Sequence, residues 1–95
     1  MLKYHKAPND LAGGFQRYVE HGIEPGSFLR FCLENDFVNA AFAADMVNRG
    51  ILSEIARFIG KEIPSICWGD PTKVLEWVAC EPAERAEILD KYKEH

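Results

Sequence analysis

The stretch FVNAAFAADMVNRGILSEIARFIGKE, residues 37–62, establishes the fold class because it keeps a helical periodicity and contains no proline. Its apolar side is formed by Val47, Ile51, Ile55, Phe58 and Ile59. The stretch predicts one long helix or two abutting helices. Of the two possible breaks, Asp45 and Gly50, we favour Asp45, because its carboxylate can cap the turn that begins at Met46.

Further helix signals precede this stretch. Asn9 or Asp10 is expected to cap a first helix that ends at Gly22. Pro25 suits the first position of a second helix. The buried stripe of that helix is expected to contain Phe28, Leu29, Cys32 and Leu33. The second helix ends before Asp36, which is expected to cap the helical stretch that follows.

Two more helices are predicted after residue 62. Pro64 ends the long helical stretch, and residues 65–69 are expected to form a loop. Asp70-Pro71 is a strong helix start, since a capping carboxylate precedes a residue that needs no N–H there. The apolar face of this helix is expected to hold Val74, Leu75, Trp77 and Val78. Residues 81–82, Glu-Pro, open a last helix with Ala86, Leu89 and Tyr92 directed inward.

These elements predict an all-α protein, a compact single-domain bundle of five or six short helices. The 95 residues form one domain, and a chain of this length buries about two thirds of its surface on folding. The ends, residues 1–9 and 94–95, are expected to be frayed.

Composition and charge exclude several classes of function. The chain holds 11 Lys and Arg against 15 Asp and Glu, a formal net charge of −4. It has no basic stripe, which argues against direct binding to nucleic acid. No apolar run approaches the roughly 20 residues of a membrane-spanning helix, and the N-terminus has no secretory signal. We therefore expect a soluble, intracellular protein without a membrane or nucleic-acid partner.

Catalytic and metal-binding motifs are absent from the sequence, so we expect no enzymatic activity, no cofactor and no bound metal. The three cysteines form no C-x-x-C pair. Cys32 and Cys80 are expected to be buried, and Cys67 is the one expected to reach solvent. His21 is expected to act as a C-terminal cap of the first helix. The competing hypothesis pairs His21 with Cys32 or Cys67 as a nucleophile.

Three segments resemble a known group of proteins. They are YVEHGIEPGSFLRFCLEND at residues 18–36, Ala44-Asp45, and IPSICWGDPTKVLEW at residues 63–77. The pattern is similar to a family of small, mostly uncharacterised proteins encoded by phages, prophages and mobile elements of proteobacteria. The resemblance brings no catalytic residue with it. It implies action in the cytoplasm of a bacterial host, where small phage proteins often inhibit host defence, as anti-CRISPR proteins do.

The leading functional hypothesis is a non-enzymatic accessory protein that binds and inhibits a host protein. The target would be a defence or nucleic-acid-handling component, blocked by occlusion or by acidic mimicry of nucleic acid. The candidate contact residues are Glu20, Glu24, Glu34, Asp36 and Trp68. Trp68 has two interpretations, an exposed interface anchor or a plug in the core.

The alternative hypothesis is a homo-oligomer that binds or sequesters a nucleotide-like ligand. Its candidate ligand-binding residues are Arg17, Tyr18, His21 and Arg30. The arginines, with Arg57 as a further choice, would bind phosphates, and Tyr18 or Phe31 would stack on a base.

Overall fold

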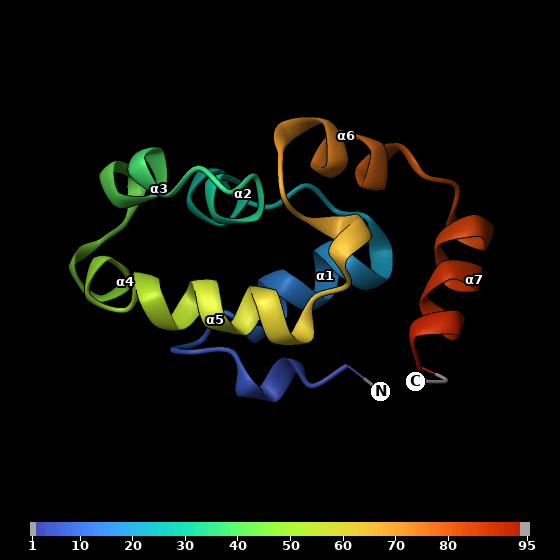
Figure 1. The fold of residues 1–95 in the computed structure, drawn as a ribbon, viewed down its shortest axis with the longest axis horizontal. Coiled ribbons are helices and arrows are strands. Elements are labelled where there is room, and N and C mark those ends of the chain that lie inside the picture. The colour runs from blue at the N-terminus through green and yellow to red at the C-terminus, as the bar shows by residue number, and fades with distance from the viewer. Residues whose placement is uncertain (1, 94–95) are drawn as a thin grey trace.

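Seven α-helices and two short 3₁₀ turns make up the regular structure of residues 2–93, the part of the chain that the computed structural model describes (Figure 1). In chain order they are η1 (Tyr4–Lys6), α1 (Ala12–His21), α2 (Ser27–Leu33), α3 (Phe37–Ala43), α4 (Met46–Gly50), α5 (Leu52–Glu62), η2 (Ser65–Cys67), α6 (Pro71–Ala79) and α7 (Pro82–Lys93). The predicted all-α class is confirmed. Of the ends that we expected to be frayed, residues 1, 94 and 95 lie outside the described residues.

Aspartate caps begin three of the helices, as predicted. The carboxylates of Asp36, Asp45 and Asp70 each accept a hydrogen bond from the backbone N–H three residues later, at 3.3, 2.8 and 2.9 Å. Gly22 ends α1 in the left-handed conformation, with φ at 66°. These short-range signals therefore placed four helix boundaries correctly.

Two predicted helix starts were wrong. α1 begins after Leu11 with no side-chain cap, because Asn9 has turned to φ 55° and its amide donates to Asn48 Oδ1 at 3.3 Å. α2 begins at Ser27, because Gly26 is still extended with ψ at 168° and serves as the N-cap. Pro25 therefore lies ahead of the helix and not at its first position.

Residues 37–62 form three helices, and this division explains why there are seven helices where five or six were expected. The favoured break at Asp45 is confirmed, and a second break follows Gly50, where Ile51 leaves helical geometry at φ −120° and ψ 21°. The chain reverses between α3 and α4, whereas α4 and α5 follow one another in nearly the same direction (Figure 1). Val47, predicted on the buried side of this stretch, is exposed.

The core lies where α1, α2, α5 and α6 meet. Its fully buried side chains include Phe15, Tyr18, Val19, Cys32, Leu33, Ile55 and Cys67. Three residues predicted to face inward do not: Leu75 and Ala86 are exposed, and Tyr92 is more than a third exposed. On α7 the buried positions are Arg85 and the predicted Leu89.

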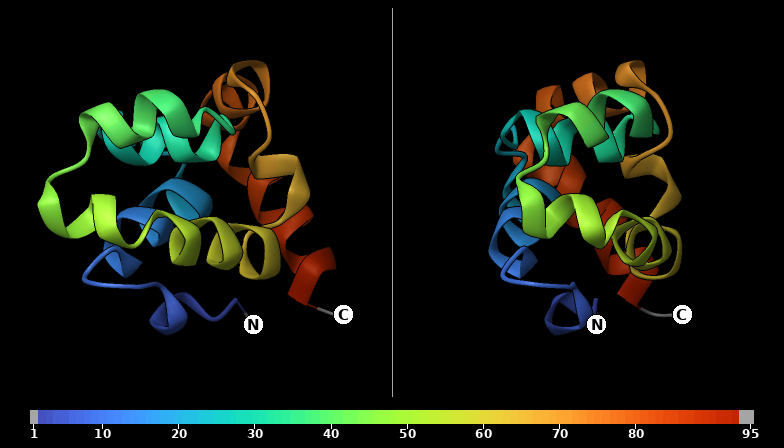
Figure 2. Two further views of the ribbon diagram at one scale, coloured as in Figure 1. Left: turned by 60° about the vertical axis from the view of Figure 1, so that its left-hand side comes forward. Right: turned by 90° about the vertical axis from the view of Figure 1, so that its left-hand side faces the viewer.

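A chain of buried hydrogen bonds ties separate elements together at this core. The Tyr18 hydroxyl donates to the Cys67 carbonyl at 2.6 Å, and Trp77 Nε1 donates to the carbonyls of Tyr18 and Val19, both at 3.2 Å. Arg85 Nη2 donates to the carbonyls of Trp77 at 3.3 Å and Cys80 at 2.6 Å. The bonds join α1 to η2 and α6, and α6 to α7. Figures 1 and 2 place α7 at one end of the molecule and the α3–α4 pair at the other.

Gly22→Ala tests the packing of α7 against the end of α1. An added Cβ meets the Arg85 guanidinium, and alanine is strained at this positive φ. We expect a loss on the order of 2 kcal/mol in the free energy of unfolding, measured with urea. Gly60→Ala is the matched control, because nothing lies near its Cβ, and a helical alanine is expected to stabilise α5. An unchanged Gly22→Ala stability contradicts this account of the junction.

Candidate interaction surface

Four large apolar side chains are exposed on the consecutive short helices α3 and α4. Val38 is 72% exposed, Phe42 84%, Met46 88% and Val47 59%. Val38 and Phe42 lie four residues apart and therefore share one side of α3. These four residues, here called the α3–α4 face, are half of the eight large hydrophobic residues that are exposed in the described part of the chain.

The α3–α4 face exists because this segment packs through small side chains. Ala40 is fully buried and Ala44 nearly so, and α3 packs mainly against α2. Phe37 packs against the core, whereas the four residues of the α3–α4 face are exposed. Burial of a side chain of this size stabilises a protein by about 1.5–3 kcal/mol, and these four residues do not make that contribution to folding. Such exposure is typical of a surface that contacts another molecule.

Acidic groups border the α3–α4 face. Residues 31–48 contain Glu34, Asp36 and Asp45 but no lysine or arginine. Neither Asp36 nor Asp45 takes part in an ion pair within residues 2–93. Arg49 is the first cation beyond this stretch, and its Nη2 donates to the Ala44 carbonyl at 3.4 Å. With Arg49 counted, and with Arg30, which lies 3.9 Å from Glu34, residues 30–49 hold three acids and two bases, a net charge of −1.

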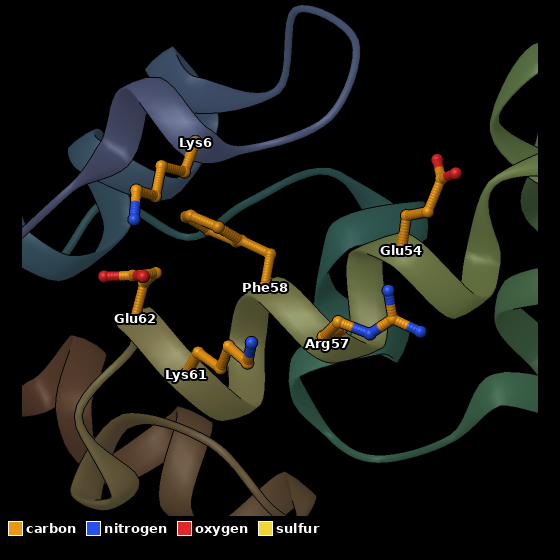
Figure 3. Close-up of a pocket in the computed structure, with 6 residues that line it drawn as sticks. All are labelled: Lys6, Glu54, Arg57, Phe58, Lys61 and Glu62. Atoms are coloured by element: carbon orange, nitrogen blue, oxygen red, sulfur yellow. The ribbon is translucent and has the colours of Figure 1, made fainter.

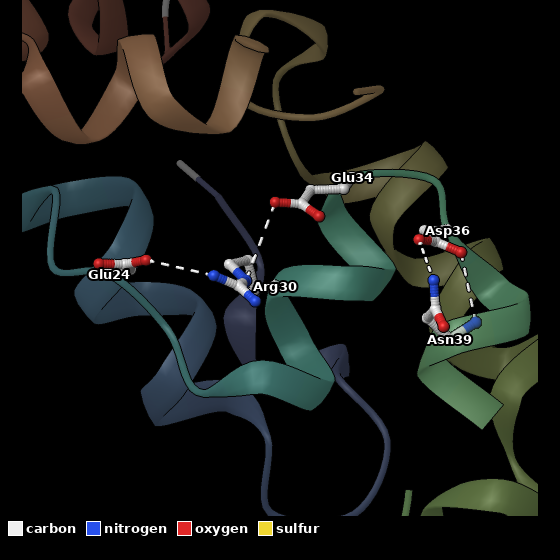
Figure 4. Close-up of polar contacts among 5 residues, drawn as sticks. All are labelled: Glu24, Arg30, Glu34, Asp36 and Asn39. Carbon is white, nitrogen blue, oxygen red and sulfur yellow. Dashed lines mark hydrogen bonds and ion pairs between the residues drawn. The ribbon is translucent and has the colours of Figure 1, made fainter. Parts of the chain in front are cut away.

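Three predicted site residues meet in an ion-pair cluster on and beside α2 (Figure 4). Arg30 Nη1 lies 3.7 Å from Glu24 Oε1, and Arg30 Nε lies 3.9 Å from Glu34 Oε2. They line one side of a groove of about 180 Å³ whose other side is apolar, from α6. Arg30 is thus shared by two carboxylates, and the cluster of one base and two acids keeps a net charge of −1.

The other predicted partner-binding residues have local structural roles. Glu20 accepts a hydrogen bond from the Tyr4 hydroxyl at 3.2 Å. Asp36 caps α3. Trp68 is partly buried against the core, and its Nε1 donates to the Ile63 carbonyl at 3.2 Å. The geometry of Trp68 favours the core-plug interpretation over the interface anchor.

The structure does not gather the predicted ligand-binding residues into one site. Tyr18 is fully buried with its hydroxyl bonded to a backbone carbonyl, so it is not available to stack on a ligand. Arg17 and His21 are exposed on α1, and Arg30 is in the ion-pair cluster. The prediction for Tyr18 is therefore corrected, because a tyrosine on the buried face of a helix was taken as accessible.

A groove between η1 and α5 is a site that sequence reasoning missed. It has a volume of about 210 Å³ and is lined by Lys6, Glu54, Arg57, Phe58, Lys61 and Glu62. Figure 3 shows Lys6 reaching from η1 past the Phe58 ring toward Glu62. The spacing of Arg57 and Lys61 on the wet side of α5 was visible in the sequence. The approach of Lys6 was not, because it depends on how the N-terminal segment packs.

The cysteines are placed differently from the prediction. Cys67 is fully buried, as is Cys32, whereas Cys80 is partly exposed. Burial raises the pKa of both the Cys32 and the Cys67 thiol to about 12, so both are protonated at neutral pH. A buried, protonated thiol is a poor nucleophile, and the proposed partner His21 is exposed.

The described residues contain neither a metal-ligand cluster nor a membrane-spanning helix. Within residues 2–93, no three His, Cys, Asp or Glu side chains are grouped so as to hold a metal ion. In the same part of the chain, every helix is too short or too polar to cross a bilayer.

Comparison with known proteins adds no relative. The chain matches no family model, no curated protein and no solved structure.

Thiol labelling tests the burial of the cysteines. At pH 8 in native buffer, a thiol reagent is expected to modify Cys80 well before Cys32 and Cys67, because Cys80 is the partly exposed cysteine of the three. Burial and Glu84 raise the pKa of the Cys80 thiol too. In guanidinium chloride all 3 cysteines are expected to react. Cys80→Ser removes the fast reaction in native buffer. Mass spectrometry identifies the labelled residue, and equally fast labelling of Cys67 contradicts the buried position.

Proposed function

We propose that this protein is a non-enzymatic binding domain that docks on another protein through the α3–α4 face and blocks it. The exposure of Phe42 and Met46 is the observation that carries the proposal. Aromatic residues and methionine are enriched at protein interfaces. Phe42 supplies a rigid anchor, and Met46 adapts to an irregular partner surface.

Occlusion is the mechanism that fits a domain of this size. Its principal dimensions are 37 × 24 × 17 Å. A standard interface takes about 800 Å² from each partner, which is a large share of one side of so small a domain. The α3–α4 face lies at one end of the longest dimension, so the domain meets its partner end-on and blocks the part of the partner's surface that this end covers.

The resemblance of residues 18–36 and 63–77 to phage-encoded proteins supports a host protein as the partner. A host defence or nucleic-acid-handling component is the target that we propose. Such proteins bind phosphates with basic surfaces, and the net charge of −4 favours association with them.

A pair of variants tests the role of the α3–α4 face. Phe42→Ser combined with Met46→Ser is expected to reduce capture of the partner from a proteobacterial lysate at least tenfold, because each residue of a binding hot spot contributes about 2 kcal/mol. Capture is quantified by mass spectrometry of the tagged protein's complexes.

Leu75→Ser is the matched control for these variants. Leu75 is 70% exposed on α6, so its replacement removes a similar apolar surface outside the α3–α4 face. We expect it to leave capture and thermal stability unchanged. Equal loss of capture in the control, or wild-type protein that captures no stoichiometric partner, contradicts the proposal.

The η1–α5 groove favours a second candidate function, the binding of a phosphate-bearing ligand. Lys6, Arg57 and Lys61 line it beside Phe58, and no ion pair within residues 2–93 engages them. Glu54 and Glu62 also line the groove, which leaves a net charge of +1. One chain forms the whole groove, so this version of the ligand hypothesis does not require an oligomer.

A thermal-shift assay tests this second candidate. Pyrophosphate or ATP is expected to raise the melting temperature, since a ligand at 100 times its Kd adds about 2.7 kcal/mol to stability. Arg57→Gln combined with Lys61→Gln is expected to abolish the shift, and Lys73→Gln on α6 to retain it. Potassium chloride at equal ionic strength controls for general salt effects. The absence of any shift removes the candidate.

A further inference from the structure

We infer that the occupant of the α3–α4 face is a protein segment that presents apolar side chains flanked by lysine or arginine. The inference rests on the proposed binding function and adds the chemistry of the partner. It follows from the charges around the face and from the way in which α3 ends.

The first observation is a pair of carboxylates at the starts of the two helices. The Asp36 carboxylate accepts hydrogen bonds from the backbone N–H and side-chain amide of Asn39, the latter at 2.7 Å (Figure 4). The Asp45 carboxylate is exposed and accepts from the Asn48 N–H. A carboxylate has about four acceptor positions, so each retains capacity for a cation from a partner.

The second observation is the open C-terminal end of α3. The helix has no basic residue in its last turn and no backbone N–H that caps it. Within residues 2–93, no backbone N–H beyond the helix donates to the carbonyls of residues 40–43. These carbonyls carry partial negative charge next to Phe42. The Arg49 side chain donates to the Ala44 carbonyl. In the described part of the chain, no side chain donates to the carbonyls of residues 40–43.

Charge also separates the possible occupants of the face. A second copy joined by two-fold symmetry brings two Asp36, two Asp45 and two Arg49 around one apolar contact, four acids against two bases. Like charges in that position oppose association. An anionic lipid surface is disfavoured for the same reason. A partner with lysine or arginine around an apolar stripe satisfies the carboxylates, the open carbonyls and the apolar side chains together.

Two synthetic peptides provide the test. Each is an amphipathic helix of about five turns with the same leucine stripe, one with lysine and the other with glutamate on the remaining positions. Fluorescence anisotropy with the full chain measures their affinities. We expect the lysine peptide to bind at least tenfold more tightly than the glutamate peptide, and Phe42→Ser to abolish its binding.

Charge variants locate the attraction on the protein. Asp36→Asn combined with Asp45→Asn keeps both helix caps, because asparagine is an equally good N-cap. We expect this double variant to lower the affinity for the lysine peptide at least fivefold. The control, Glu87→Gln combined with Asp90→Asn, removes the same charge from α7 at the opposite end of the molecule. We expect it to leave the affinity unchanged.

The outcomes separate this inference from the function on which it rests. Equal binding of both peptides, lost in Phe42→Ser, overturns the basic partner and leaves the apolar docking face intact. The basic partner is also overturned if the α7 control loses as much affinity for the lysine peptide as the aspartate variant does, or if the lysine peptide does not bind at all. The capture experiment with the lysate tests the docking function separately. A wild-type dimer by light scattering that Phe42→Ser makes monomeric assigns the face to a second copy. Binding to phosphatidylserine vesicles assigns it to a membrane.

Discussion

The indole N–H of Trp77 shared between the carbonyls of Tyr18 and Val19 is the contact on which the rest of the fold depends. These carbonyls belong to the last turn of α1. The Tyr18 carbonyl also accepts from the Gly22 N–H at 2.9 Å. The Ile23 N–H turns back to Arg17, so the indole is the donor for Val19. The same tyrosine reaches η2 with its hydroxyl. Trp77 thereby fixes α6 against the end of α1 and satisfies buried polar groups within the core.

Arg85 extends this arrangement to α7. Its guanidinium is buried without a carboxylate, and in the described part of the chain its Nε has no hydrogen-bond partner. Burial of a charge is costly. Two carbonyls at the end of α6 and the Trp77 ring, 5.8 Å away, offset that cost. The close approach to Gly22 completes the junction.

How much the sequence revealed depended on the range of the interaction. Asp36, Asp45, Asp70 and Gly22 marked helix ends correctly, because caps and left-handed turns involve residues within four positions. The positions of Val47 and Leu75 were wrong, since a periodic pattern does not show where a helix bends or which neighbour covers it. Cys67 was taken for an exposed loop residue because its burial results from contacts made far away in the sequence.

The candidate surfaces show the same difference between short-range signals, which the sequence displays, and long-range packing, which it does not. The acidic and basic residues near α2 were identified, but only packing shows that Glu24 and Glu34 share the one cation of Arg30. The α3–α4 face could not be located from the sequence, because its apolar residues suit a core helix and an exposed patch equally well. One sequence signal does favour exposure of the larger residues, namely that Ala40 and Ala44, four residues apart, form a small-residue side of the segment. The structure is needed to show that α2 packs on this alanine side and leaves the larger residues exposed.

The packing of α3 through alanines separates the residues that hold the domain together from those on its outer side. A change at Val38, Phe42 or Met46 alters the α3–α4 face without opening a cavity in the core. The sequence of this face is consequently free to drift at small cost to folding. Under the proposed inhibition of a host protein, that freedom lets the face follow mutations of the partner while the scaffold is kept.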